Sequence, residues 1–513
     1  MKVDSGKYRI SSERLRKNCF YEEELAFCNS SQDVPSFDGV IGQERAEKSM
    51  QFGLNMNTRG YNIFVVGSQG TGKSTYTQAV VTQKAEKGLV PLDWCYINNF
   101  NEWDKPIAVS LPAGQGKVFQ KDIDKLIFDL KVIIPKAFEN AEYQQKIDLI
   151  YRTANEKREA MLHSIEQEAF ENGFTVNQVP AKILLIPMRY GRPIMPEEYS
   201  KISAEERQQI DEKRSKLAIK IEEKIREGQM LEKEANEQII ELESQTVYQA
   251  AKPLIDVLKE KYNEDNKIVE YLDMILEDVA DDYIIFKNDG IQTSPINANQ
   301  AQQSSKQQNE ANPYETMVFT QEDYVETFSK YKVNLFIDNE KREGAPVVNE
   351  SSPYYYNLFG KIEYKSQMLS MTTDFTMIKP GSIHTANGGY LILQAKDLLM
   401  DPYAWDALKK ALKSKQPTIE NIGEQYRLVP TVTLKPEPIP LDIKVILIGS
   451  PLYYMIFATD EDFQKLFKVK VDFDMEMKRN EENLHQYVSF VSAVCRNDNL
   501  KHFDRGALAR VIE

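Results

Sequence analysis

The chain has 513 residues, of which 42% are hydrophobic and 28% are charged, and its formal net charge is −14 at pH 7. This length suggests about three domains with ample apolar chain for a buried core, and the negative balance argues against a broad surface for nucleic-acid phosphates. No stretch approaches the roughly 18 apolar residues of a membrane span, and residues 1–18 lack the apolar core of a signal peptide. We therefore expect a cytoplasmic protein without a membrane partner.

The first predicted elements surround a phosphate-binding loop at Gly67–Ser74. Residues 37–50 (FDGVIGQERAEKSM) predict a turn and a helix whose apolar face would cover an adenine pocket. The run Tyr61–Val66 (YNIFVV) predicts a buried strand, the letters GSQGTGKS then match GxxxxGK[ST] in full, and a helix is expected from about Lys73 to Glu86. The alternative is a glycine-rich turn with a solvated lysine, and the strand and helix on the correct sides argue against it.

This loop predicts binding of ATP or ADP with magnesium. Its glycines let successive backbone N–H groups and the helix N-terminus approach phosphate oxygens. Lys73 would reach the β and γ phosphates, and Ser74 would be the magnesium ligand. The predicted nucleotide-binding residues of the loop are Gly67, Gln69, Gly70, Thr71, Gly72, Lys73, Ser74 and Thr75.

Two short strands are predicted next, at 94–98 and 107–111, and from about residue 118 the composition becomes helical. Ser203–Glu206 forms a capping box, and apolar residues then recur at spacings of three, four and seven. A helix from Ser203 to about Lys252 would be about 75 Å long, and we expect it to project as a coiled-coil arm paired with a helix near Lys121–Asn172.

A small hairpin is predicted at the tip of this arm, where Ile183–Pro196 alternates apolar runs around a Tyr190–Gly191 turn. Helical periodicity alone carries no chemistry. The arm is therefore either a contact for a substrate or partner or a structural spacer, and the sequence leaves both open.

The chain is expected to return to an α/β core after a flexible linker. Residues 288–313 are polar and rich in Gln, Asn and Ser. Further buried strands are then predicted at 332–338 (KVNLFID), 390–393 and 444–448 (KVILI). With two of the earlier strands, these runs predict a parallel, helix-covered sheet of about five strands, interrupted by the insertion.

Four sequence blocks resemble the AAA+ region of bacterial Lon-related ATP-dependent proteases, in the branch that has a coiled-coil insertion and members with eroded ATPase motifs. The blocks are GYNIFVVGSQGTGKS, GAPVVNESSPYYYNLFGKIEY, TDFTMIKPGSIHTANGGYLIL and VILIGSPLYY. The resemblance implies an AAA+ P-loop NTPase sheet with a long helical insertion and the start of a helical lid, assembled as a homo-hexamer that handles unfolded or damaged polypeptides. It also places Ile41, within Ile41-Gly42-Gln43, in the box beside adenine.

We accordingly divide the chain into an N-terminal segment at 1–36, two parts of the α/β core at 37–117 and 331–475, a helical coiled-coil insertion with a hairpin at 118–288, a flexible linker at 289–330 and the start of the lid at 476–513.

Three departures from the family pattern predict weak or absent hydrolysis. Where family hydrolases end a strand in Asp-Glu, this chain has Gln394 and Ala395, and Asp397 lies on the helix that follows. The sensor position is Ser450, where Asn is common. The region that supplies an arginine finger in the family holds Lys465 and Lys468. Lysine lacks the planar, bidentate guanidinium of arginine and binds a transferring phosphoryl group less well.

The family's pore segment holds Tyr364, Met368, Met371 and Phe375, which could grip a polypeptide, although aromatic residues more often serve packing. The sequence contains no PxxGxSAG-like block, which in the family holds the serine nucleophile that works with a lysine base. We therefore expect a fragment that cannot cut peptides alone. The resemblance leaves open whether this chain is an enzyme. His384 has no neighbours at metal-ligand spacing.

The cysteines are expected to be reduced and mostly buried, because they show no CxxC spacing. They are Cys19, Cys28, Cys95 and Cys495.

Three other functions remain open at this stage. One is an active AAA+ ATPase or unfoldase. Another is an ATP-independent chamber gate in which nucleotide only holds the ring together. The third is a nucleic-acid-associated ATPase with a coiled-coil arm. The net charge of −14 argues against this third function.

Overall fold

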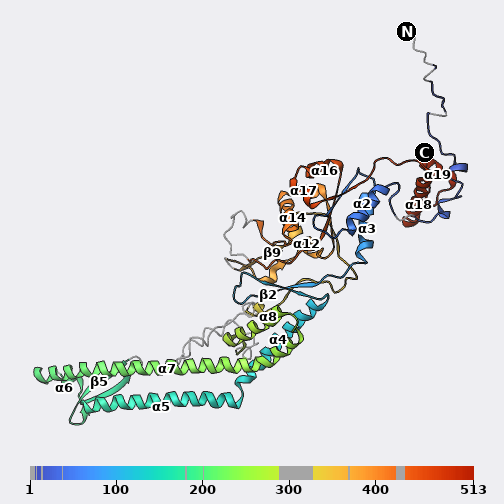
Figure 1. Ribbon diagram of the computed structural model, residues 1–513. Helices are drawn as coiled ribbons and strands as arrows, with labels where there is room; N and C mark the ends of the chain where they lie inside the picture. The colour runs from blue at the N-terminus through green and yellow to red at the C-terminus, as the bar shows by residue number, and fades with distance from the viewer. Residues whose placement is uncertain are drawn as a thin grey trace, which may run out of the picture. The chain divides into compact units, whose positions relative to one another are not determined.

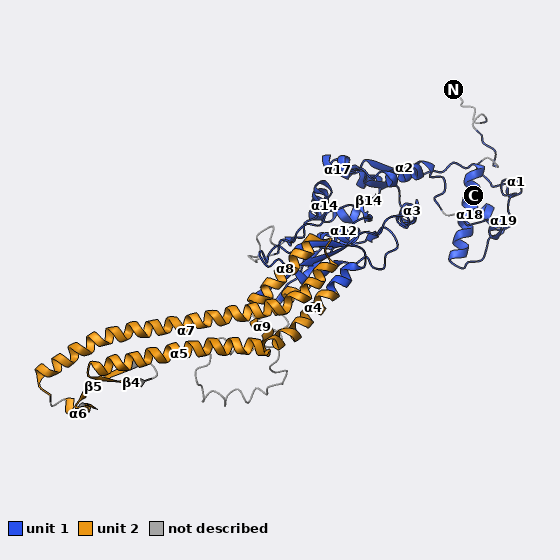
Figure 2. Ribbon diagram, turned by 60° about the horizontal axis from the view of Figure 1, so that its bottom comes forward, with its two compact units in different colours: residues 1–120, 333–513 blue, residues 121–332 orange. Residues whose placement is uncertain are grey.

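The computed structural model divides into two compact units, formed by residues 1–120 with 333–513 and by residues 121–332 (Figure 2). Because the chain leaves the first unit once and returns to it, the second unit is an insertion in the first. The structure describes Gly6 and residues 9–12, 15–36, 39–179, 182–199, 202–287, 327–367, 370–422 and 434–513.

A five-stranded parallel sheet forms the centre of the first unit (Figure 1). Its strands, in spatial order, are β15 (Val469–Asp472), β1 (Ile63–Val66), β14 (Lys444–Gly449), β13 (Tyr390–Gln394) and β8 (Val347–Glu350). Strand β1 is buried at all four positions, as expected for an apolar, β-branched run with helices over both faces. This sheet confirms the predicted α/β class.

Alternate residues of β1 serve two separate cores. Ile63 and Val65 pack with α2 (Glu44–Asn55) and α3 (Lys73–Ala85) on one face. Phe64 and Val66 pack on the other face. The helices on that face are α14 (Pro402–Ser414), α16 (Pro451–Ala458) and α17 (Glu461–Leu466). Alternation along the strand therefore assigns each side chain to one face.

The predicted membership of the parallel sheet was wrong in part. β2 (Asp93–Ile97) pairs antiparallel with both β3 (Ile107–Leu111) and β7 (Asn334–Ile337) in a separate three-stranded sheet. The edges of the parallel sheet are formed instead by β8 and β15, which we had not predicted as strands of it. A short apolar run predicts a buried strand but does not identify its partners, which explains the error.

The N-terminal segment folds against the lid helices. Residues of α18 (Glu481–Asn497) and α19 (Arg505–Ile512) share a small core with Cys19, Leu25 and Val34. Arg496 donates to the carbonyl oxygens of Gln32 and Val34. The four cysteines are buried and free, as expected.

The second unit is built from long helices, and their lengths differ from our prediction. The segment expected as one helix near 121–172 is two, α4 (Gln115–Phe138) and α5 (Ala141–Glu171), and α7 (Ala204–Lys261) runs nine residues beyond the expected end at Lys252. Pro253 lies inside α7. The buried stripe of Val247, Ala251 and Ile255 continues across it, so packing against α8 (Asn266–Asp281) stabilises the helix through the proline.

A buried glutamate joins α5 and α7 to α9 (Ile284–Lys287). Glu243 accepts hydrogen bonds from the Tyr143 hydroxyl at 2.8 Å, the Tyr283 hydroxyl at 2.5 Å and the Lys287 ammonium at 2.7 Å. Burial alone would raise the pKa of Glu243, but these three hydrogen bonds outweigh it and hold the pKa below its ordinary value. The charge is therefore buried with its partners in place.

A small sheet caps the end of the α5–α7 pair. The predicted turn at Tyr190–Gly191 is present, with φ of 52° and 78°, and it joins β5 (Lys182–Arg189) to β6 (Arg192–Pro193). A third strand that we did not predict, β4 (Phe174–Val179), pairs along β5.

Residues 288–326 of the predicted linker lie outside the described ranges. Phe328–Tyr331 is a 3₁₀-helix in which both end residues are buried, so the predicted linker boundary at residue 330 falls inside a packed element. Among the helices of the described ranges, none combines the length and apolar composition needed to cross a bilayer.

Candidate nucleotide-binding site

The phosphate loop leaves the carboxyl edge of the parallel sheet between its two neighbouring strands. The N–H of Gly67 donates to the carbonyl of Gly449 at the end of β14, at 3.2 Å, and the N–H of Phe473 after β15 donates to the carbonyl of Val66, at 2.8 Å. A Cβ at Gly67 would lie 2.8 Å from that of Phe473. Glycine is therefore required where the loop begins.

The loop itself is shaped as a phosphate cradle. Gly70 and Gly72 have φ of 82° and 75°, and a Cβ at either would meet no atom within 4 Å. Helix α3 begins at Lys73, so its unpaired N–H groups start beside this open space. The backbone is therefore left-handed and uncrowded where phosphate oxygens would lie.

Lys73 points back into the loop. Its ammonium donates to the carbonyl of Ser68 at 2.9 Å, as does the Thr71 hydroxyl at 2.9 Å. Burial lowers the pKa of Lys73, because the charged form loses hydration there. A carbonyl carries only a partial charge, so a phosphate would be a stronger partner for this ammonium. Ser74 and Thr75 are exposed on the first turn of α3. The residues present thus fit a nucleotide with magnesium.

The predicted adenine-side box, residues 41–43, lies against the connector that follows β15. The Gln43 side chain makes two bonds to Asp474: it donates to the carbonyl at 3.1 Å and accepts from the N–H at 2.8 Å. Ile41 and Gly42 are partly buried beside this clamp. The structure therefore brings the predicted adenine-side box next to a segment that the sequence had not singled out.

Strand β13 ends without an acid. Gln394 lies in register with Ile448 of β14 and follows Ile392, which packs in the core on the α3 side. Its carboxamide therefore lies on the α3 side of the sheet. Ala395 is fully buried in the opposite core. Neither residue can supply a carboxylate, which is what magnesium binding and water activation use in hydrolysing relatives.

Other carboxylates at this edge of the sheet already have polar partners. Asp472, at the end of β15, is in register with Val66 and pairs with Lys470 at 2.9 Å. Glu350, the last residue of β8, accepts from the Ser382 hydroxyl and from the N–H of Ser352. Asp401 caps α14 and also accepts from the N–H of Tyr355 at 2.9 Å. Asp397 lies on α13 (Ala395–Leu399), beyond the strand end.

The other predicted site residues fall on two different edges of the sheet. Ser450 follows β14 directly and caps α16, so it lies at the carboxyl edge with the loop. The N–H of Lys468 donates to the carbonyl of Gly60, which precedes β1, and a Cβ at Gly60 would be 2.3 Å from the carbonyl of Lys465. Both lysines therefore lie at the amino edge, away from the loop of their own chain.

The predicted pore residues have different environments. Phe375 is only 4% exposed and packs in a core with Tyr96 and Ile378, so of the two alternatives for this residue the structure supports packing. The Tyr364 hydroxyl accepts from Asn421. Met371 is 65% exposed in the hairpin of β10 (Lys365–Gln367) and β11 (Ser370–Thr372), and Met368 lies outside the described residues.

His384 is a neutral core residue. Burial lowers its pKa to about 3, and its ring packs edge-on against Phe336. Within the part of the chain that the structure describes, no group of three metal-ligating side chains is present.

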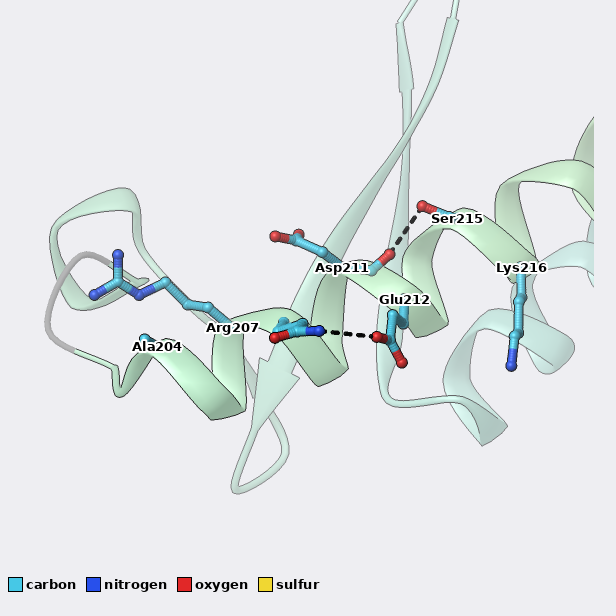
Figure 3. Close-up of a pocket in the computed structure, with 7 residues that line it drawn as sticks. Ala204, Arg207, Asp211, Glu212, Ser215 and Lys216 are labelled. Carbon is cyan, nitrogen blue, oxygen red and sulfur yellow. Dashed lines mark hydrogen bonds between the residues drawn. The ribbon is translucent and has the colours of Figure 1, made fainter.

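A hollow in the second unit does not make a binding site. It lies along the start of α7, where the Gln208 and Glu212 side chains bond to each other and the Ser215 hydroxyl bonds to the Asp211 carbonyl (Figure 3). The lining residues come from turns of one helix, and these polar groups are already paired.

The strand order β15-β1-β14-β13-β8, with a phosphate loop after β1, is that of an AAA+ P-loop NTPase domain. A family model described as "LonB-like, AAA domain" matches residues 343–474, and one described as "Lon-like LonC helical domain" matches residues 93–126. The chain therefore carries a Lon-related AAA+ region, as the sequence predicted.

Comparisons beyond these family models are weak. No curated protein matches the chain. Two crystal structures of NtrX from Brucella abortus, one in complex with ADP, align at 19% and 20% identity and a TM-score of 0.21. The alignments cover 31% of this chain and 33% and 32% of theirs. Nothing about function follows from this partial likeness.

Proposed function

We propose that this chain binds ATP or ADP with magnesium and hydrolyses ATP slowly or not at all, as the nucleotide-binding part of a Lon-like ATP-dependent proteolytic machine in the cytoplasm. One observation carries the proposal. An intact phosphate cradle follows β1, and at the same carboxyl edge of the sheet β13, which is separated from β1 by β14, ends in Gln394–Ala395 without an acid.

The binding half of the proposal rests on Lys73 and the first turn of α3. Lys73 would exchange the Ser68 carbonyl for phosphate oxygens, and the N–H groups of Gly70–Ser74 would donate to the same phosphates. Ser74 would hold the magnesium ion, which offsets phosphate charge when bound.

The hydrolysis half rests on what Gln394 and Ala395 cannot do. Phosphoryl transfer to water needs a positioned water and an acid that holds the metal. A carboxamide carries no charge, and a methyl group accepts no proton. Glu350 and Asp401 are held by other hydrogen bonds, which supports slow turnover.

The polypeptide-handling part of the proposal extends to partners. Exposed Met371 in the β10–β11 hairpin would contact unfolded or damaged polypeptide, and the α5–α7 arm would be a further contact. The chain would form a homo-hexamer that handles polypeptides for a Ser-Lys protease domain, which residues 1–513 do not include. Lys465 lies away from its own phosphate loop, which supports a role toward a neighbouring subunit.

The test measures binding and turnover separately. Calorimetry with Mg-ATP should show binding by the wild type, and Lys73→Ala should weaken it about tenfold to a hundredfold, since a hydrogen bond to a charged group is lost. Lys84→Ala is the matched control, because Lys84 lies near the end of the same helix and bonds to Asn55. Phosphate release should stay near background. Rapid release that Lys73→Ala abolishes would establish an active motor instead.

A further inference from the structure

A methionine in the connector after β15 contacts the phosphate loop through its sulfur. The Ser68 hydroxyl donates to Sδ of Met475 at 2.8 Å. Ser68 is the second residue of the loop, and Met475 lies three residues beyond the end of β15. A thioether sulfur is only a weak hydrogen-bond acceptor, so chemistry at the sulfur would change this contact.

The backbone directly before Met475 is anchored. The Phe473 ring packs edge-on against Tyr76 of α3. Asp474 makes two hydrogen bonds with the Gln43 side chain. These contacts fix the point from which the side chain of Met475 extends, and they keep it beside the loop.

Met475 is also open to solvent. Its exposed fraction is 77%, the largest of any methionine in the described ranges. The four cysteines, which are the other sulfur groups of the chain, are all buried. A small oxidant in water therefore reaches the Met475 sulfur without any opening of the fold.

Ser68 connects this sulfur to the ammonium that would hold the phosphates. Its hydroxyl donates to Met475, while its carbonyl accepts from the Lys73 ammonium at 2.9 Å and from the Thr71 hydroxyl at 2.9 Å. A displacement of Ser68 therefore moves the acceptor that positions Lys73.

We propose that Met475 is an oxidation site whose sulfoxide weakens nucleotide binding at the phosphate loop; this rests on the proposed nucleotide binding. A peroxide transfers one oxygen atom to the sulfur. The S–O bond forms as the O–O bond breaks, the sulfur is oxidised by two electrons, and hydrogen peroxide is reduced to water. The product is methionine sulfoxide, a polar side chain that a methionine sulfoxide reductase can return to the thioether.

The added oxygen acts on the loop in two ways. It takes up space where the Ser68 hydroxyl now meets the sulfur at 2.8 Å, so Ser68 must move. It is also a stronger acceptor than the thioether and carries partial negative charge, so it competes with phosphate oxygens for the donors of the loop. Both effects oppose nucleotide binding.

The experiment measures ADP affinity by calorimetry on the full chain with magnesium, before and after hydrogen peroxide that is then removed with catalase. Tandem mass spectrometry of the peptide that holds Met475 follows the gain of one oxygen. Oxidised wild type should bind ADP about tenfold more weakly, roughly the loss of one hydrogen bond. Met475→Leu has a similar volume and accepts no oxygen, so its own affinity should not change with the treatment. Met475→Gln, which carries a polar oxygen without oxidant, should bind ADP more weakly than Met475→Leu.

The matched control is Met230→Leu on α7, because Met230 is 60% exposed and lies in the other unit. This variant and Met477→Leu should lose affinity with peroxide as the wild type does. Equal ADP affinity before and after complete oxidation of Met475 would overturn the assignment alone, as would a loss that persists in Met475→Leu. A wild type that binds no ADP before peroxide would overturn the proposed function as well.

Discussion

Ala395 lies against the backbone of Gly449, so that a Cβ added at Gly449 would be 3.0 Å from the Ala395 methyl. This contact joins the end of β13 to the end of β14 inside the buried core, where Phe64 also packs. The place where hydrolysing relatives carry a glutamate is therefore filled by apolar packing in this chain.

Restoring the two acidic residues should have unequal effects. Gln394→Asp replaces a partly exposed amide and should cost little stability while improving magnesium-dependent binding. Ala395→Glu places a carboxylate in a fully buried site and should destabilise the fold by about 2 kcal/mol or more. Denaturant unfolding of both variants, alongside Mg-ATP calorimetry, tests this. Equal stability of the two would contradict the packing described for Ala395.

Two glycines of the loop should respond differently to alanine. Gly70→Ala meets open space but must keep φ near 82°, so it should fold and bind nucleotide with about 1 kcal/mol of backbone strain. Gly67→Ala meets Phe473 at 2.8 Å and should disturb the loop and β15 together, lowering both thermal stability and ATP affinity. Thermal unfolding and calorimetry separate the two cases. If Gly67→Ala gave the same thermal stability and ATP affinity as Gly70→Ala, the inference that Phe473 crowds position 67 would be contradicted.

The Glu243 network should make the second unit sensitive to acid. The pKa of Glu243 in the folded protein is below its ordinary value, so its contribution is present above that value and is lost as the pH falls through the folded pKa. Glu243→Ala leaves the Tyr143 and Tyr283 hydroxyls without their partner and should cost about 1–3 kcal/mol.

The measurement is hydrogen exchange across α5, α7 and α9 at two pH values, near neutrality and near pH 4. Glu241→Ala, two residues away on the same helix and bonded only to Gln245, is the control. Equal protection at both pH values in the wild type would speak against the charge being held by these partners.

The contacts of Arg496 should anchor the N-terminal segment to the lid. The guanidinium donates to two carbonyls, of Gln32 and Val34, and to the Ser36 hydroxyl. Arg496→Ala should lower lid stability by about 1–3 kcal/mol and open the segment to proteolysis. Limited trypsin digestion followed by mass spectrometry identifies the cleaved sites. Lys48→Ala, which removes an exposed pair with Glu44 on α2, should leave the cleavage sites within residues 15–36 unchanged.

The sequence was informative wherever local pattern decides structure. The loop at Gly67–Ser74, the strand before it, the capped start of α7 at Ser203 and the turn at Tyr190–Gly191 all follow from residue type and spacing, since backbone conformation there depends on a few neighbouring residues. The resemblance to Lon-related proteins then supplied the family.

Long-range pairing could not be predicted in the same way. β2 and β7 are apolar runs like β1, yet they pair with each other in a separate sheet. The Asp93 carboxylate in β2 accepts there from the N–H groups of Gly116 and Asn339, which are distant in sequence. Gln486 meets Gly42 over a separation that no spacing rule covers. The length of α7 beyond Pro253 depends on packing with α8, which overrides the local preference of proline.

The shared core of Cys19, Leu25, Val34, Val488 and Leu508 has a consequence for synthesis of the protein. The earliest of these side chains leave the ribosome hundreds of residues before their packing partners exist. During that interval the segment around Leu25 lacks the apolar surfaces of α18 and α19 against which it packs in the folded protein.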